Sequence, residues 1–131
     1  MREVETMDVI AVDDDPNGLE LLRMLLESAD HRVRTSRNVS GALELLSQGP
    51  TPSVVVTDLL LGQDCDSGYR LISSIRADAS YDSVAVVALT GVTSADDLDR
   101  ALLAGADACL AKPMDIDVFL ETLASVTSVR G

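Results

Sequence analysis

The chain has 131 residues, of which 22 are acidic and 10 are basic, and its formal net charge is −12 at pH 7. This length suffices for one domain with its own core, and the acidic balance argues against binding nucleic acid or an anionic membrane surface. No apolar run approaches the roughly 18 residues of a membrane span, and Met1 to Met7 lack the features of a signal peptide. Because Cys65 and Cys109 are too few for a disulfide framework, we expect a reducing, cytoplasmic location.

The first part of the chain predicts two strand–helix units. Val9 to Val12 is a short apolar run, typical of a strand buried on both faces, and three consecutive aspartates follow it. The third of these, Asp15, is placed to cap a helix that begins at Pro16. Residues 31–35 form a shorter and more polar run that predicts an edge strand. A weaker helix then contains Ala42, Leu43, Leu45 and Leu46 and is closed by Gly49 and Pro50.

The rest of the chain repeats this pattern three times. Apolar runs predict strands at residues 54–56, 84–89 and 109–111. Each run is followed by apolar residues at helical spacing. These are Leu71, Ile72 and Ile75 after Gly68, then Leu98, Ala101, Leu102 and Gly105, and finally Ile116, Phe119, Leu120 and Leu123. Ser94 with Asp97 resembles a capping box for the second of these helices, and Asp115 can cap the third.

The alternation of five strands with five helices predicts an α/β fold in which right-handed crossovers join the strands of a parallel sheet. No linker or internal repeat interrupts the series. We therefore expect one domain over residues 1–131, with its core at about residues 8–126 and short tails at both ends.

Polar side chains gather at the predicted carboxyl ends of the strands, where an open parallel sheet binds its ligands. They are Asp13, Asp14, Asp58, Thr90 and Lys112. Three carboxylates at close range require a cation, and Mg²⁺ suits them because it binds one or two carboxylates and keeps positions for waters and phosphate oxygens. A carboxylate nucleophile, a metal, a lysine and a hydroxyl are typical of phosphoryl transfer. Asp58 stands alone and is the candidate nucleophile, whereas Asp13 and Asp14 form a pair suited to holding metal.

The chain resembles the CheY-like receiver domains of two-component response regulators over nearly its whole length. The resemblance rests on short segments that occur together, in order, at strand ends. These segments are Val12 to Pro16, Val56 to Asp58, Ala88 to Gly91, Gly105 to Asp107 and Lys112 with Pro113. The resemblance implies a flavodoxin-like (βα)5 doubly wound sandwich with the strand order 2-1-3-4-5, which is the order described for CheY itself.

The resemblance also implies a function. Asp58 would accept a phosphoryl group from a phosphohistidine of a sensor histidine kinase or a histidine phosphotransfer protein, in a Mg²⁺-dependent reaction that changes partner binding. Asp14 would bind Mg²⁺ directly and Asp13 mostly through water, and Asp58 and the backbone carbonyl of Leu60 would complete the protein ligands. The protein would catalyse only its own phosphoryl transfer and dephosphorylation.

Two further expectations come from the same resemblance. Thr90 and Lys112 would contact the phosphoryl oxygens, and the peptide bond between Lys112 and Pro113 would be cis. The face from Ala95 to Val126, which contains the fourth helix, fifth strand and fifth helix, would bind a downstream protein target or a second copy of the chain.

The chain departs from the family at two places. Three positions before Lys112, where the family usually has an aromatic residue that reports phosphorylation, this chain has Cys109. The segment from Leu59 to Ser67 is longer than usual and has Gly62 in place of the common proline. We interpret this segment as a solvated loop, with a partner-selecting rim as the alternative.

Two other functions are open at this stage. A small phosphatase of the haloacid dehalogenase type is one, because Asp13 and Asp15 after the first strand also resemble the nucleophile motif of that family. A receiver-like adaptor that is not phosphorylated is the other. The residues after Val126 are too few for an output domain, so the chain is expected to be either a stand-alone regulator or part of a larger regulator or hybrid kinase.

Overall fold

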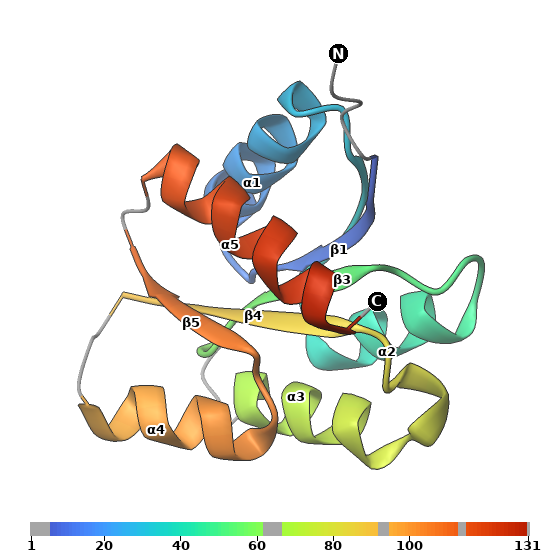
Figure 1. The fold of residues 1–131 in the computed structure, drawn as a ribbon, viewed down its shortest axis with the longest axis vertical. Coiled ribbons are helices and arrows are strands. Elements are labelled where there is room, and N and C mark those ends of the chain that lie inside the picture. Colours follow the sequence, from blue (N-terminus) through green and yellow to red (C-terminus); the bar gives the residue numbers. More distant parts are fainter. Residues whose placement is uncertain (1–5, 62–66, 92–94, 113–114, 131) are drawn as a thin grey trace.

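The computed structural model describes residues 6–61, 67–91, 95–112 and 115–130. These residues contain one sheet of five parallel strands in the order β2-β1-β3-β4-β5 (Figure 1). This confirms the predicted fold class and strand order. The strands are β1 (Asp8–Val12), β2 (Arg32–Ser36), β3 (Val54–Asp58), β4 (Ala85–Thr90) and β5 (Ala108–Ala111).

The helices follow the strands in the predicted alternation. They are α1 (Pro16–Ser28), α2 (Val39–Ser47), α3 (Ser67–Ala77), α4 (Ala95–Ala104) and α5 (Ile116–Arg130), with a short 3₁₀ helix η1 (Ala79–Tyr81) after α3. The side chain of Asp15 accepts the N–H of Asn17 at 3.1 Å, which confirms its role as the cap of α1. Asp115 accepts the backbone N–H groups of Asp117 and Val118, as expected for a cap of α5.

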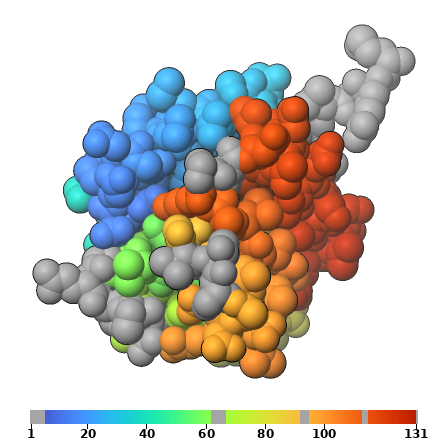
Figure 2. Space-filling view, turned by 90° about the vertical axis from the view of Figure 1, so that its left-hand side faces the viewer, coloured from blue at the N-terminus to red at the C-terminus, as the bar shows by residue number. Residues whose placement is uncertain are grey.

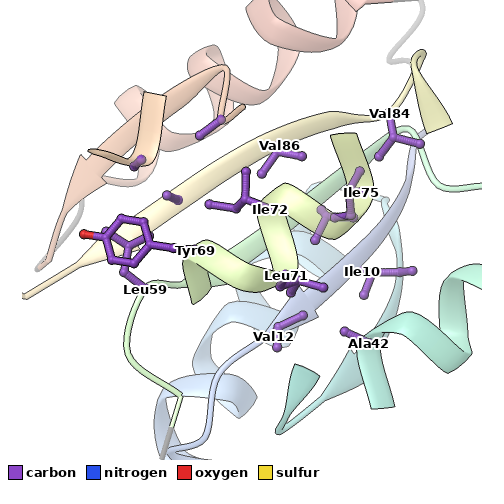
Figure 3. Packing of buried hydrophobic residues seen from close by; sticks show 14 of the residues in the cluster. Ile10, Val12, Ala42, Leu59, Tyr69, Leu71, Ile72, Ile75, Val84 and Val86 are labelled. Carbon is purple, nitrogen blue, oxygen red and sulfur yellow. The ribbon is translucent and has the colours of Figure 1, made fainter. Parts of the chain in front are cut away.

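Helices cover both faces of the sheet. α1 and α5 lie on one face, and α2, α3 and α4 lie on the other (Figure 1). Alternate residues of each strand contribute to the two layers: Ile10 and Val12 belong to the α2–α3 side, whereas Val9 and Ala11 belong to the α1–α5 side. Figure 3 shows the first of these clusters, in which aliphatic side chains of α3 pack on β1 and β4. Among the described helices, none is both long and apolar enough to cross a bilayer.

The structure differs from the predicted elements at the end of the chain. α5 continues to Arg130, past Val126, where the sequence pattern placed a short tail. The reason is a tertiary contact, because the Arg130 guanidinium donates to Asp107 at 2.9 Å and to the carbonyl of Asp82 at 3.1 Å. These interactions hold the last turn of the helix against the body of the protein, and sequence periodicity contains no information about them.

Two apolar residues that were assigned to helix core faces are exposed. Leu102 of α4 is 49% exposed and Ile116 of α5 is 40% exposed. α4 contacts the cluster under it through the small side chain of Ala101, which is fully buried. In α5, Phe119 and Leu123 are the buried positions, which leaves the first residue of the helix at the surface.

Candidate functional site

The carboxyl ends of four strands bring the predicted site residues to one edge of the sheet. Asp13 and Asp14 follow β1, Asp58 ends β3, Thr90 ends β4, and Lys112 follows β5. Figure 2 faces this edge, where segments from early, middle and late parts of the chain meet. A parallel sheet produces this arrangement because every strand runs in the same direction.

Three of these residues form a compact carboxylate cluster. Asp13, Asp14 and Asp58 each offer an oxygen, and the three oxygens lie within 4.8 Å of one another. Asp13 is only 1% exposed, and the other two are partly buried. Like charges this close, shielded from water, repel strongly unless a cation lies between them.

Lys112 supplies one cation to this cluster. Its Nζ donates to Oδ2 of Asp58 at 2.9 Å and to Oδ2 of Asp13 at 3.1 Å. The backbone supports this position, because the N–H of Lys112 donates to the carbonyl of Thr90 at 2.8 Å. The lysine therefore bridges two of the three carboxylates, and its placement depends on the pairing of β4 with β5.

The carboxylates of the cluster differ in how firmly they are held. Oδ1 of Asp13 accepts the N–H of Asp15 at 3.0 Å, so both oxygens of Asp13 are engaged. Oδ1 of Asp58 accepts the N–H of Leu60 at 3.2 Å. The Asp14 carboxylate makes no hydrogen bond with another described residue, and its side chain remains available to an external ligand.

The donor set fits Mg²⁺. Clustered carboxylate oxygens are hard ligands of the kind that this ion prefers, and a site at the protein edge leaves room for the waters that it retains. Asp14 is the carboxylate best placed for direct binding, because Asp13 is already bound by Lys112 and a backbone N–H. The backbone carbonyl of Leu60 stays a predicted ligand, since the structure gives a contact for its N–H alone.

Thr90 is 7% exposed at the end of β4, and its role toward a phosphoryl group stays a prediction.

Several other expectations concern residues outside the described part of the chain. They are the cis bond to Pro113, the capping box at Ser94, Cys65, and the part of the Leu59 to Ser67 loop that spans residues 62–66.

Sequence reasoning missed two small residues that support the site. A Cβ on Gly68 would lie 2.5 Å from the carbonyl oxygen of Asp58 and 2.4 Å from Cα of Leu59, so only glycine fits. The Oγ of Ser67 accepts the N–H of Leu61 at 2.8 Å and donates to the carbonyl of the same residue at 3.0 Å. In the sequence, the adjacent Ser67 and Gly68 at the start of a helix could have indicated this close contact with the segment after Asp58.

Cys109 lies in β5 and is half-buried. Burial, reinforced by the charge of Asp97, raises the pKa of its thiol above the usual value. Cys109 is a free thiol, and because a protonated thiol is a poor nucleophile, the raised pKa argues against a nucleophilic role.

Lys112 is the only lysine of the chain, so its titration can be followed directly. Burial by itself would lower the pKa of its ammonium group, but the hydrogen bonds and charges of Asp58 and Asp13 outweigh burial and raise the pKa. While both carboxylates carry their charges, the ion pairs therefore stabilise the fold fully at pH values below the ordinary lysine pKa of about 10.4. This stabilisation is lost as the pH rises through the raised value.

We expect Asp58→Asn to lower the pKa of Lys112, because the substitution removes a charged partner while burial persists. NMR of the Nζ nitrogen over an alkaline titration measures this directly. Asp30→Asn makes the same chemical change at an exposed residue on the opposite edge of the sheet, where φ is 66° and asparagine is well tolerated. A Lys112 pKa that is equal in both variants would contradict the role assigned to Asp58.

Comparison with known proteins agrees with this geometry. The family model of the response regulator receiver domain matches residues 9–124. The response regulator Rre1 of Synechocystis is 33% identical over 114 residues, which are 86% of this chain and 48% of that protein. An uncharacterized 14.6 kDa protein of Leptolyngbya boryana is 32% identical over 115 residues, which are 88% of this chain and 86% of that protein.

A solved structure shows the same fold. The chemotaxis protein CheY4 of Vibrio cholerae has a TM-score of 0.84 at 24% identity, over 93% of this chain and 99% of that chain. The family match covers most of the described residues. The chain belongs to the response regulator receiver domain family of two-component systems, whose members are signalling domains and not conventional enzymes. The match does not favour the phosphatase or the adaptor alternative.

Proposed function

We propose that this receiver domain is a switch that accepts a phosphoryl group on Asp58 in a Mg²⁺-dependent reaction. The observation that carries the proposal is the position of Lys112 Nζ, which lies 2.9 Å from Asp58 inside a cluster of three carboxylates. A lysine so placed is ready to stabilise the negative charge of an incoming phosphoryl group.

In the proposed reaction, a carboxylate oxygen of Asp58 attacks the phosphorus of a phosphohistidine on a histidine kinase or a histidine phosphotransfer protein. A P–O bond forms, the P–N bond breaks, and the departing imidazole takes a proton from solvent. The product is an acyl phosphate. Attack by water on its phosphorus breaks the P–O bond, releases inorganic phosphate and restores the carboxylate, which resets the switch.

Each remaining residue of the site has a defined part in this proposal. Asp14, Asp13 and Asp58, with the Leu60 carbonyl, would hold Mg²⁺, which when bound neutralises phosphoryl oxygens and orients them. Lys112 bridges Asp13 and Asp58 before transfer and pairs with a phosphoryl oxygen after it. Thr90, buried at the end of β4, would donate its hydroxyl to another.

The partners follow from the family and from the surface. A phosphohistidine donor lies upstream, and a protein target, or a second copy of the chain, would bind the α4–β5–α5 face. That face presents exposed apolar side chains in a strongly acidic protein, and such side chains favour contact with another protein surface. They are Leu102, Ile116 and Val118.

Incubation with acetyl phosphate and Mg²⁺, followed by intact mass measurement, tests the proposal. We expect a gain of one phosphoryl group that Asp58→Asn abolishes, that omission of Mg²⁺ prevents, and that the matched Asp30→Asn variant retains. The absence of an adduct under all conditions would favour the adaptor alternative, and continuous hydrolysis of a generic phosphate ester would favour the phosphatase.

A further inference from the structure

Tyr69, in the first turn of α3, connects α3 to α4. Its hydroxyl donates to Oδ1 of Asp97 at 3.3 Å and reaches the Asp97 carbonyl oxygen at 3.5 Å. The guanidinium carbon of Arg100 lies 4.0 Å from the centroid of the ring, which is a cation–π contact. Ala101 is the one buried residue of α4, so the helix has little apolar contact with the core. The contacts of Tyr69 with Asp97 and Arg100 therefore contribute to the position of α4.

The same turn of α3 is fixed to the segment that follows Asp58. The N–H of Gly68 donates to the carbonyl of Leu59 at 3.1 Å, and the two backbones touch so closely that a Cβ would not fit. Ser67 holds both the N–H and the carbonyl of Leu61. A displacement of residues 59–61 therefore has to move the start of α3.

Phosphorylation of Asp58 would disturb this segment. Oδ1 of Asp58 accepts the N–H of Leu60, and Oδ2 accepts Lys112. One of these oxygens becomes the bridging oxygen of the acyl phosphate and loses most of its capacity as an acceptor. The hydrogen bond to Leu60 or the one to Lys112 is then weakened or lost. Leu60 lies between Leu59 and Leu61, which are hydrogen-bonded to Gly68 and Ser67 of α3.

The hydrogen bond between Tyr69 and Asp97 is sensitive to a displacement of the start of α3. Its length of 3.3 Å exceeds the usual 2.7–2.8 Å of an O–H···O bond, so a small displacement is enough to break or tighten it. Figure 3 shows Tyr69 at the end of the α3 cluster beside Leu59, with its hydroxyl directed away from the other labelled side chains. On β5, Cys109 packs against the same cluster with a small side chain and supplies no ring.

We propose that Tyr69 is the positioning residue through which the occupancy of Asp58 changes the position of α4. The inference rests on the proposed function, because it requires that Asp58 be phosphorylated. In this chain, the aromatic residue that reports phosphorylation is on α3, and its partners are Asp97 and Arg100 of α4.

Tyrosine fluorescence tests the first half of the inference. The chain has two tyrosines and no tryptophan, so Tyr81→Phe leaves Tyr69 as the only tyrosine, and its emission can be excited selectively over that of phenylalanine. With acetyl phosphate and Mg²⁺, we expect the emission of this variant to change in proportion to the phosphorylated fraction measured by intact mass. Full phosphorylation with unchanged emission would overturn the inference and leave the proposed function intact. No gain of mass would overturn both.

Backbone amide NMR tests the second half. In Tyr69→Phe, which keeps the ring and removes the hydroxyl, we expect phosphorylation to shift the amides around Asp58 and Thr90 as in the wild type. The shifts over Ala95–Ala104 should be reduced. Tyr81→Phe is the matched control and should keep the wild-type shifts in α4. Equal α4 shifts in the two variants would show that Tyr69 only fills the core.

Discussion

Replacing Lys112 with methionine is expected to slow phosphorylation of Asp58 by acetyl phosphate by about 10²–10³-fold, the usual effect of removing one preorganised donor from a charge-stabilising site. Methionine keeps an unbranched side chain of comparable length but removes the ammonium group that bridges Asp58 and Asp13. Without this ammonium group, the negative charges of Asp58 and Asp13 repel the negatively charged phosphoryl group more strongly as it approaches.

The rate is measured as the increase in phosphorylated protein by intact mass, with donor and Mg²⁺ in excess. Arg32→Met is the matched control, because Arg32 is 73% exposed and pairs with Asp8 at the opposite edge of the sheet. This control should react as the wild type does. A Lys112→Met variant that reacts as fast as Arg32→Met would remove Lys112 from the proposed mechanism.

Asp107→Ala is expected to lower the free energy of unfolding by about 3 kcal/mol, the lower end of the range for removing one partner of a buried ion pair. The Asp107 carboxylate accepts hydrogen bonds from Arg76 at 2.9 Å, from Arg130 at 2.9 Å and from the N–H of Val86 at 2.8 Å. Alanine leaves Arg76, whose side chain is 15% exposed, without this counter-charge.

Urea denaturation measures the change. Asp8→Ala removes a carboxylate from an ion pair whose arginine is largely exposed, and it should cost at most about 1 kcal/mol. Equal losses in the two variants would mean that the Asp107 network contributes no more than a surface pair. Because Arg130 is one of its partners, Asp107→Ala should also loosen the last turn of α5, which loss of amide protection there would reveal.

Most elements of this protein could be predicted because four of the five strands are short apolar runs and each helix repeats its apolar residues at helical spacing. The remaining strand, β2, is more polar, as expected for an edge strand. The caps at Asp15 and Asp115 were also predictable, since capping depends on neighbouring residues alone. The end of α5 was not. It depends on a contact between Arg130 and Asp107, which lie 23 positions apart in the chain.

The candidate site was predictable for a different reason. A parallel sheet places the carboxyl ends of its strands together, so polar residues after Val12, Val56, Leu89 and Ala111 were bound to meet once the strand pattern was recognised. How the carboxylates differ was not predictable. Asp13 and Asp14 are chemically identical neighbours, and only the fold buries the first against Lys112 and leaves the second available.

The sequence by itself determined which residues converge: the acidic pair after the first strand, Asp58, Thr90 and Lys112. Local patterns encode the strands, and the common direction of the strands brings their ends to one edge. Only the tertiary structure decided how these residues and their neighbours pair. Lys112 bridges Asp13 and Asp58, and Tyr69 reaches α4, because side-chain contacts between elements far apart in the chain depend on packing distances that no spacing in the sequence records.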